Sequence, residues 1–314
     1  LYIMTQPLWA EEPVLKMHIF KAPTAKVKSS NDLKMIIFDQ NAKKRLIIPP
    51  SAQAVAKAKV AHRKLEAFKY WSGGISTGYQ YERTAWQVSN PSIAETWQGI
   101  DIWKMRADLG FHLPIGFLLK GYAEYGFSLN GNIARTGEFN NISSNRLSSG
   151  YTTAFSGALG YEFVLGEKRQ QVWGTLTPLI GYAYDEQMYK SNNNEYNTAW
   201  QGPWVGLEFG LGFARHHELF GSADVHWADF KALGAQQNYS LEHNATALGY
   251  KVSTGYRFQP NQRWAFSIIL DYQHWQTGSG TETLTLPTQG FIESPLVSVK
   301  RDALGIRAAM DVAF

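Results

Sequence analysis

The 314-residue chain contains no cysteine, so disulfide bonds and thiolate metal sites are excluded. It also lacks any apolar run of about 18 residues, the length that a membrane-spanning helix requires. With a mean hydropathy of −0.29, a hydropathy scan would class the chain as soluble. The strands of a transmembrane barrel alternate between apolar and polar residues and average out to the same weak signal. The lack of a long apolar run therefore excludes a helical membrane protein, whereas a transmembrane β-barrel remains compatible with the sequence.

Short enzymatic motifs are missing as well. The sequence has no HExxH metal motif, no P-loop and no dinucleotide fingerprint. We therefore predict no cofactor and no metal site.

The charge is divided between two segments that meet near residue 70. Residues 1–70 carry a net charge of +8, and residues 71–314 carry −4. Residues 1–10 are typical of a signal-peptide remnant, since Ala10 is the small residue expected before a cleavage point. Residues 11–70 are predicted to form a basic periplasmic extension with a helix near residues 51–68, for which Ser51 is a suitable cap. This extension is either solvated or contacts peptidoglycan, and without a binding motif nucleic acid is not expected.

From residue 71 onward the sequence alternates between two unlike faces. In the last fourteen residues, one face carries Leu304, Ile306 and Met310, whereas the other carries charged and small residues. Strict alternation predicts a strand, and an apolar face opposite a polar one suits lipid outside and water inside. The same pattern recurs in ten stretches: residues 75–82, 103–111, 117–127, 151–163, 172–184, 205–213, 219–229, 248–258, 264–273 and 301–314.

The connections between these stretches predict a barrel in the bacterial outer membrane. Tight turns near residues 113, 168, 216 and 260 alternate with long polar loops, as periplasmic turns alternate with extracellular loops in such barrels. We therefore expect an all-β fold, a ten-stranded antiparallel transmembrane β-barrel over residues 71–314 with a partly helical N-terminal extension. Phe314, an aromatic residue at the end of the last strand, is expected to be the signal that the barrel assembly machinery reads. Outer-membrane lipid, including lipopolysaccharide, is expected around the wall.

Charges of both signs lie on the predicted inner face. In a soluble core they would be prohibitive unless each one were paired, whereas in a lumen they can pair with one another and with water. We predict a lumen charge network of Lys104, Arg106, Asp108, Lys120, Glu124, Glu162, Glu208, Lys251, Arg257, Asp271, Arg307 and Asp311.

Aromatic and glycine-rich segments give the chain a family resemblance. They are residues 119–126 (LKGYAEYG), 200–206 (WQGPWVG) and 226–230 (HWADF). With ten strands, the chain resembles the omptin family, and more closely an omptin-like group of outer-membrane proteins from Chlamydia-like and other intracellular bacteria. The resemblance covers residues 71–314.

Omptins are proteases, so the resemblance implies an aspartate pair and an Asp-x-His pair at the barrel mouth that activate water. The predicted outer loops at residues 86–97 and 233–243 contain neither pair. Asp224 and His226 have the Asp-x-His spacing, but they fall within a strand, too low for the mouth.

Other groupings of polar residues are better explained by exposed polar turns and loops or by chance. Ser240, Glu242 and His243 form a lipase-like set on a predicted loop, and Asp271 and His274 lie near the predicted outer rim. His216 and His217 fall in a predicted periplasmic turn.

The leading functional hypothesis is a non-catalytic barrel with a charged, self-filled lumen and long extracellular loops, acting in surface interaction or envelope structure. The alternative is an omptin-like protease or another hydrolase at the barrel mouth. A porin is disfavoured, because small barrels are filled by their own side chains and open pores need about 16 strands.

Overall fold

A computed structural model of the chain describes residues 35–37, 46–48, 71–89, 92–113, 115–137, 143–165, 172–191, 194–213, 216–236, 239–261, 263–286 and 290–313. The chain divides into two compact units, Leu1–His62 and Arg63–Phe314. In the first unit, β1 (Met35–Ile37) pairs antiparallel with β2 (Leu46–Ile48). The predicted signal remnant, the predicted helix near residues 51–68 and Phe314 lie outside the described residues.

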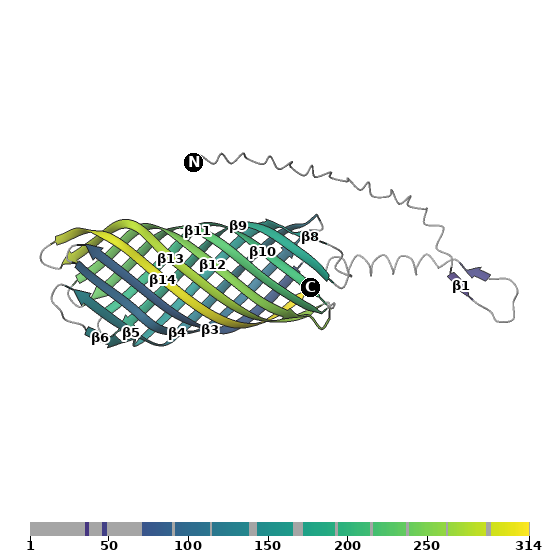
Figure 1. The fold of residues 1–314 in the computed structure, drawn as a ribbon, viewed down its shortest axis with the longest axis horizontal. Helices are drawn as coiled ribbons and strands as arrows, with labels where there is room; N and C mark the ends of the chain where they lie inside the picture. The colour runs from purple at the N-terminus through teal and green to yellow at the C-terminus, as the bar shows by residue number, and fades with distance from the viewer. Residues whose placement is uncertain are drawn as a thin grey trace, which may run out of the picture. The chain divides into compact units, whose positions relative to one another are not determined.

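The second unit is a closed antiparallel barrel (Figure 1). Its long strands are β3 (Trp71–Ser89), β4 (Ser92–His112), β5 (Phe117–Gly137), β7 (Ser149–Tyr161), β9 (Val172–Ser191), β10 (Asn194–Phe213), β11 (His217–Gln236), β12 (Tyr239–Phe258), β13 (Trp264–Leu286) and β14 (Gly290–Ala313). The ring closes where β14 pairs with β3. Two short strands, β6 (Ser143–Arg146) and β8 (Phe163–Leu165), extend the edges of β5 and β9. No helix in the described part of the chain is long and apolar enough to cross a membrane.

One end of the barrel, here called the turn end, contains the first residue of β3 and the last residue of β14. Next to it lies the membrane half, for example residues 71–81 of β3 and 264–273 of β13. Its outer face is apolar and exposed, as at Ile75, Ile268 and Leu270. Ten residue steps of about 3.3 Å, tilted by roughly 40°, span about 25 Å along the barrel axis. This is the height of the apolar band in outer-membrane barrels.

The outer half, which comprises the remainder of each strand, has the opposite polarity. Its outer wall is polar, with Arg83, Lys231 and Lys300 exposed. Its interior holds a hydrophobic core that includes several fully buried aromatic side chains. They are Trp97, Tyr189, Trp200, Phe230 and Trp275. The outer half is therefore built like a small water-soluble barrel, because apolar side chains pack inside it and water faces the wall.

The structure confirms the ring of ten strands and corrects the prediction of long outer loops. Residues 86–89 and 92–97 belong to the ends of β3 and β4, and residues 233–236 and 239–243 belong to β11 and β12. Strand β5 continues beyond the predicted stretch at residues 117–127, into the polar segment expected to be a loop, as far as Gly137. The long strands reach 13 to 24 residues, because the alternation continues beyond the membrane after the apolar residues have moved to the inner face.

Candidate functional site

The lumen of the membrane half contains a cavity of about 550 Å³ that is lined by charged side chains. It extends to the turn end, where Ser72, His112 and Arg263 line it. All twelve residues of the predicted lumen charge network line this cavity, including Glu162 near the turn end.

Most of these charges are paired with one another, within a strand, between neighbouring strands or across the lumen. Lys104 Nζ lies 2.6 Å from Glu124 Oε1, and Lys120 pairs with Glu208. The other pairs are Arg106 with Asp108, Arg307 with Asp271, and Arg257 with both Glu218 and Asp311. Glu218 was not in the predicted network because it was assigned to a turn. The pairing offsets part of the desolvation cost of these charges.

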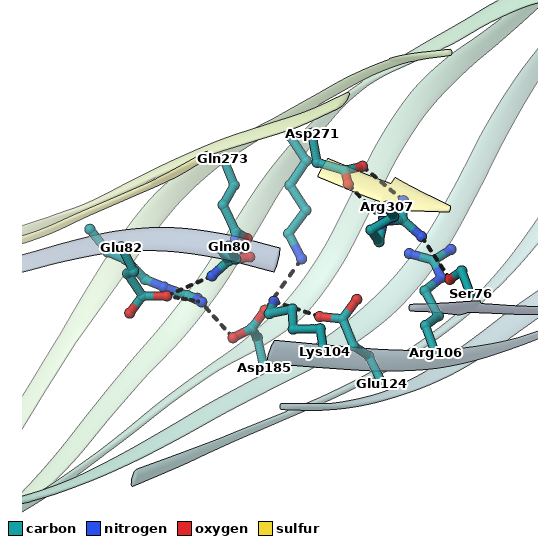
Figure 2. Close-up of polar contacts among 12 residues, drawn as sticks. Ser76, Gln80, Glu82, Lys104, Arg106, Glu124, Asp185, Asp271, Gln273 and Arg307 are labelled. Atoms are coloured by element: carbon teal, nitrogen blue, oxygen red, sulfur yellow. Dashed lines mark hydrogen bonds and ion pairs between the residues drawn. The ribbon is translucent and has the colours of Figure 1, made fainter. Parts of the chain in front are cut away.

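At the outer end of the cavity, three buried charges form a cluster. Arg301 is fully buried, and its two terminal nitrogens donate to Asp185 Oδ1 at 2.8 Å and to Glu82 Oε2 at 3.0 Å. Glu82 also accepts hydrogen bonds from Gln80 and from the hydroxyl of Tyr189. Figure 2 shows Gln80 and Gln273 beside Glu82, and the pair of Arg307 with Asp271 deeper in the lumen. We call Glu82, Asp185 and Arg301 the buried triad.

Beyond the buried triad, aromatic rings fill the barrel. Trp275 packs against Trp200, with ring centroids 5.4 Å apart, and Trp200 packs against Phe230 at 4.4 Å. Nearer the mouth, Trp97 contacts both Tyr189 and Tyr196. The described residues therefore close the lumen between the cavity and the outer end of the barrel.

A second polar cluster lies just inside the outer end. His243 is fully buried, and its Nε2 lies 2.6 Å from Glu282 Oε2. Its Nδ1 lies 2.9 Å from the hydroxyl of Tyr196. An ionised carboxylate only accepts, so when the ring is neutral, Nε2–H donates to Glu282 and the tyrosine hydroxyl donates to Nδ1. We call Tyr196, His243 and Glu282 the rim relay, to which Glu95 contributes a nearby carboxylate.

The rim relay has the order of a nucleophile, a base and an orienting acid, but its tyrosine is poorly suited to attack. Burial raises the pKa of Tyr196 well above its ordinary value, and the carboxylates of Glu95 and Glu282 add to the effect. A catalytic nucleophile normally has a lowered pKa or an exposed attacking atom. With Tyr196 and His243 both buried, the geometry fits a structural relay better than a reactive one.

The raised pKa of Tyr196 predicts alkaline instability. A tyrosine that stays protonated in the folded state stabilises the barrel below about pH 10. That contribution falls by about 1.4 kcal/mol per pH unit above pH 10 and is lost as the pH passes the folded-state pKa. We expect Tyr196→Phe to make the decline in unfolding free energy less steep by this amount, measured by urea unfolding in detergent between pH 8 and 11.5. The exposed Tyr182→Phe serves as the control, and equal slopes for the wild type and Tyr196→Phe would contradict the assignment.

Asp224 and His226 lie on the same inner face of β11, as their spacing indicates, and both line the cavity. His226 is 3% exposed and sits between Trp204 and Trp275, with ring centroids 5.7 and 5.1 Å away. Neither of its ring nitrogens has a hydrogen-bond partner, nor does Asp224 Oδ1. An acid–base pair for hydrolysis requires the carboxylate to orient the imidazole, and this contact is missing between the two described residues.

Substitution of His226 distinguishes packing from chemistry. An unsatisfied buried polar group costs about 1–3 kcal/mol, so an apolar ring of similar shape should be tolerated. We expect His226→Phe to leave the unfolding free energy unchanged or raise it by about 1 kcal/mol. Urea unfolding in detergent measures this, and a loss of more than about 2 kcal/mol would indicate that the imidazole makes a required polar contact.

The remaining candidate groupings are separated by the fold. Ser240 and Glu242 are exposed on the outer wall of β12, whereas His243 is buried, so the lipase-like set does not exist. Similarly, Asp271 pairs with Arg307 in the lumen, and His274 faces outward and pairs with Asp302 at 2.8 Å.

The histidines of the turn near residue 216 make contacts near the end of β12. His216 contacts the carbonyl oxygen of Gln259, and His217 contacts the hydroxyl of Tyr256. The described residues contain no group of three or more side chains suited to hold a metal ion.

Comparison with known proteins shows a similar fold. Residues 188–314 match the model of a family described as Protochlamydia outer membrane protein. The chain is similar to the outer membrane protease OmpT from Escherichia coli, with 12% identity, a TM-score of 0.60, and a match covering 78% of this chain and 97% of that chain. At this identity the likeness shows the fold alone. No curated protein matches the chain.

Two further solved structures are less similar. One is the translocator domain of the autotransporter NalP from Neisseria meningitidis, with 10% identity, a TM-score of 0.34, and 83% and 97% of the two chains covered. The other is the outer membrane protein OprG from Pseudomonas aeruginosa, with 10% identity, a TM-score of 0.35, and 78% and 97% covered.

Proposed function

Because this chain folds as an omptin-like outer-membrane β-barrel, we propose that it is a closed, non-catalytic barrel acting in surface interaction or envelope structure. Its outer half is a rigid platform that projects beyond the membrane. The platform presents a polar wall and short strand connections to the exterior. The membrane half anchors it and pairs its own charges internally.

One observation carries this proposal: the polarity of the two barrel faces is reversed between the membrane half and the outer half. A channel would need a water-filled path through both halves. A protease would need its acid, base and bound water at an open mouth. Here the aromatic core occupies that space, with Trp97, Trp200 and Trp275 each about 1% exposed. The reversal therefore supports a barrel that is open toward the turn end only.

The polar groups near the mouth also support a structural role. His243 is held by Tyr196 and Glu282, and Glu95 accepts a hydrogen bond from the indole nitrogen of Trp97 at 2.6 Å. These groups are engaged with one another and are buried, so a peptide at the surface would not reach them without opening the core.

Because the chain has no cysteine, single cysteine variants test this proposal directly. Ser222→Cys places a thiol in the cavity, Thr198→Cys places one in the buried outer core, and Glu242→Cys places one on the exposed outer wall. The variants are reconstituted in vesicles, and a membrane-impermeant maleimide is added outside. Complete labelling of Glu242→Cys selects preparations in which the outer half faces outward.

In these preparations we expect Ser222→Cys to react only after detergent opens access to the turn end, and Thr198→Cys to react only after unfolding. Labelling of Ser222→Cys from the outer side of intact vesicles would establish a path through the mouth and refute the closed barrel. A parallel assay with a pooled peptide library tests whether the barrel is non-catalytic. Cleavage by the folded wild type that is lost in Tyr196→Phe, His243→Gln or Asp224→Asn would replace it with an enzymatic function.

A further inference from the structure

The outer wall contains a hollow of about 710 Å³ that spans strands β9 to β13. The side chains that define it are Tyr182, Pro203, Trp227, Asp229, Tyr250 and His274. Tyr182, Trp227 and Tyr250 are 56%, 51% and 42% exposed, so each presents a large part of its ring to the surroundings. The lumen cavity and the rim relay lie on the other face of the barrel wall.

Small residues and an interrupted strand pairing form the floor of the hollow. Strands β10 and β11 pair at Gln201–Asp229 and again at Trp204–His226, with Gly202 and Pro203 left out between them. Proline has no N–H to donate to the neighbouring strand. A side chain at Gly202 would overlap the carbonyl oxygen of Trp227. The backbone therefore lies at the bottom of the hollow and the aromatic rings form its sides.

Two aromatic walls stand two strands apart. Tyr182 of β9 pairs with Pro203 of β10, and the next strand, β11, contributes Trp227. Neighbouring strands are about 4.8 Å apart, so the two side chains originate about 9.5 Å from each other. This spacing admits a group between the two rings that lies within about 6 Å of both ring centroids, the range of a cation–π contact.

The charge around the hollow favours a cation. Asp229 is exposed at the outer edge of the aromatic pair. None of the described residues that line the hollow is lysine or arginine. An anionic phosphate without a bridging cation would therefore meet a carboxylate and no lysine or arginine there.

The height of the hollow on the wall corresponds to lipid headgroups. On its membrane side the wall is apolar, with Ile180, Val205 and Val252 exposed. On its outer side the wall is polar, with Lys231 and Glu242 exposed. Tyrosine and tryptophan are enriched at this boundary in membrane proteins.

We propose that this hollow binds the choline headgroup of a zwitterionic phospholipid in the surrounding leaflet. The quaternary ammonium group sits between Tyr182 and Trp227 and faces the carboxylate of Asp229. Aromatic side chains bind quaternary ammonium groups by this electrostatic attraction, which strengthens where water is excluded. The acyl chains then lie along the apolar wall on the membrane side of the hollow, so both the headgroup and the acyl chains of the lipid contact the barrel.

Native mass spectrometry of the protein released from mixed vesicles tests the proposal. The vesicles contain phosphatidylcholine, phosphatidylethanolamine and phosphatidylglycerol in equal amounts with identical acyl chains. We expect phosphatidylcholine to be retained about tenfold more strongly than phosphatidylglycerol, a preference of the size that cation–π contacts provide. Trp227→Ala should abolish this preference and Asp229→Asn should reduce it. The matched control is Trp103→Ala, which removes an exposed tryptophan elsewhere on the wall.

Equal retention of all three lipids by the wild type, or an unchanged preference in Trp227→Ala, would show an unspecific lipid annulus and overturn the proposal. Preferential retention of phosphatidylglycerol, or of lipopolysaccharide in a second set of vesicles, would overturn the charge argument. Heat-modifiable gel mobility verifies folding, and because the substitutions lie on the outer wall, they leave the interior packing intact.

Discussion

Removing the guanidinium of Arg301 is expected to destabilise the barrel by about 3–5 kcal/mol. In Arg301→Ala, Glu82 and Asp185 lose the cation that both share and remain buried as uncompensated charges. Lys251 lies 3.5 Å from Asp185 and offsets part of the loss, but no second cation pairs with Glu82 among the described residues. Urea unfolding in detergent at neutral pH measures the change.

The adjacent residue provides a matched control for this prediction. Lys300 has the same charge and is exposed on the outer wall, so Lys300→Ala should change stability by less than about 1 kcal/mol. Arg301→Lys, which keeps the charge and loses the two-pronged geometry, should fall between the two. Equal stability of Arg301→Ala and Lys300→Ala would contradict the role of the buried triad.

Truncation of Trp275 is expected to cost about 3–5 kcal/mol as well, for a different reason. Trp275 is 1% exposed and lies between the lumen cavity and the aromatic core, packed against His226 and Trp200. Its ring also covers Gly249, where a side chain would overlap it. Trp275→Ala removes these contacts and leaves a void next to the cavity, so we expect both lower stability and leakage of ions through the barrel.

Trp275→Phe should retain most of the stability, since it keeps an aromatic ring in the layer. Trp103→Ala is the control, because Trp103 is 41% exposed on the wall of the membrane half. If Trp275→Ala were as stable as Trp103→Ala and as impermeable to ions as the wild type, Trp275 would not be needed to close the barrel.

The membrane half could be predicted well from the sequence. The period-two pattern identified ten strands, and it assigned all twelve predicted network residues to the side that lines the cavity. This works because lipid requires an uninterrupted apolar outer face on every strand, so a single rule applies along the whole segment.

The outer half was wrongly predicted to be loops because the apolar residues change from the outer face to the inner face at the membrane boundary. In β11, His226, Ala228 and Phe230 point inward, and Trp227, Asp229 and Lys231 point outward. The alternation therefore continues, but the apolar residues change from the outer face to the inner one. Where the two faces exchange roles, neither one looks consistently apolar, and the polar residues suggest a loop.

The buried triad and the rim relay were beyond sequence reasoning, because each joins distant strands. Arg301 is 219 residues from Glu82 and 116 residues from Asp185. Tyr196 and His243 come from strands that are not neighbours, β10 and β12. Alternation states which face a residue occupies, but the curvature of the closed barrel decides which side chains meet across it.

The central claim is that the folded barrel is closed at its outer half, and single-channel recording in planar lipid bilayers tests it most directly. Protein whose folding is verified by heat-modifiable mobility is inserted at neutral pH, with Trp275→Ala recorded in parallel. The account predicts no steady ion conductance for the wild type and discrete conductance steps for Trp275→Ala. Stable, ohmic conductance of the wild type would contradict the account, because it would require a continuous water path where the structure places the aromatic core.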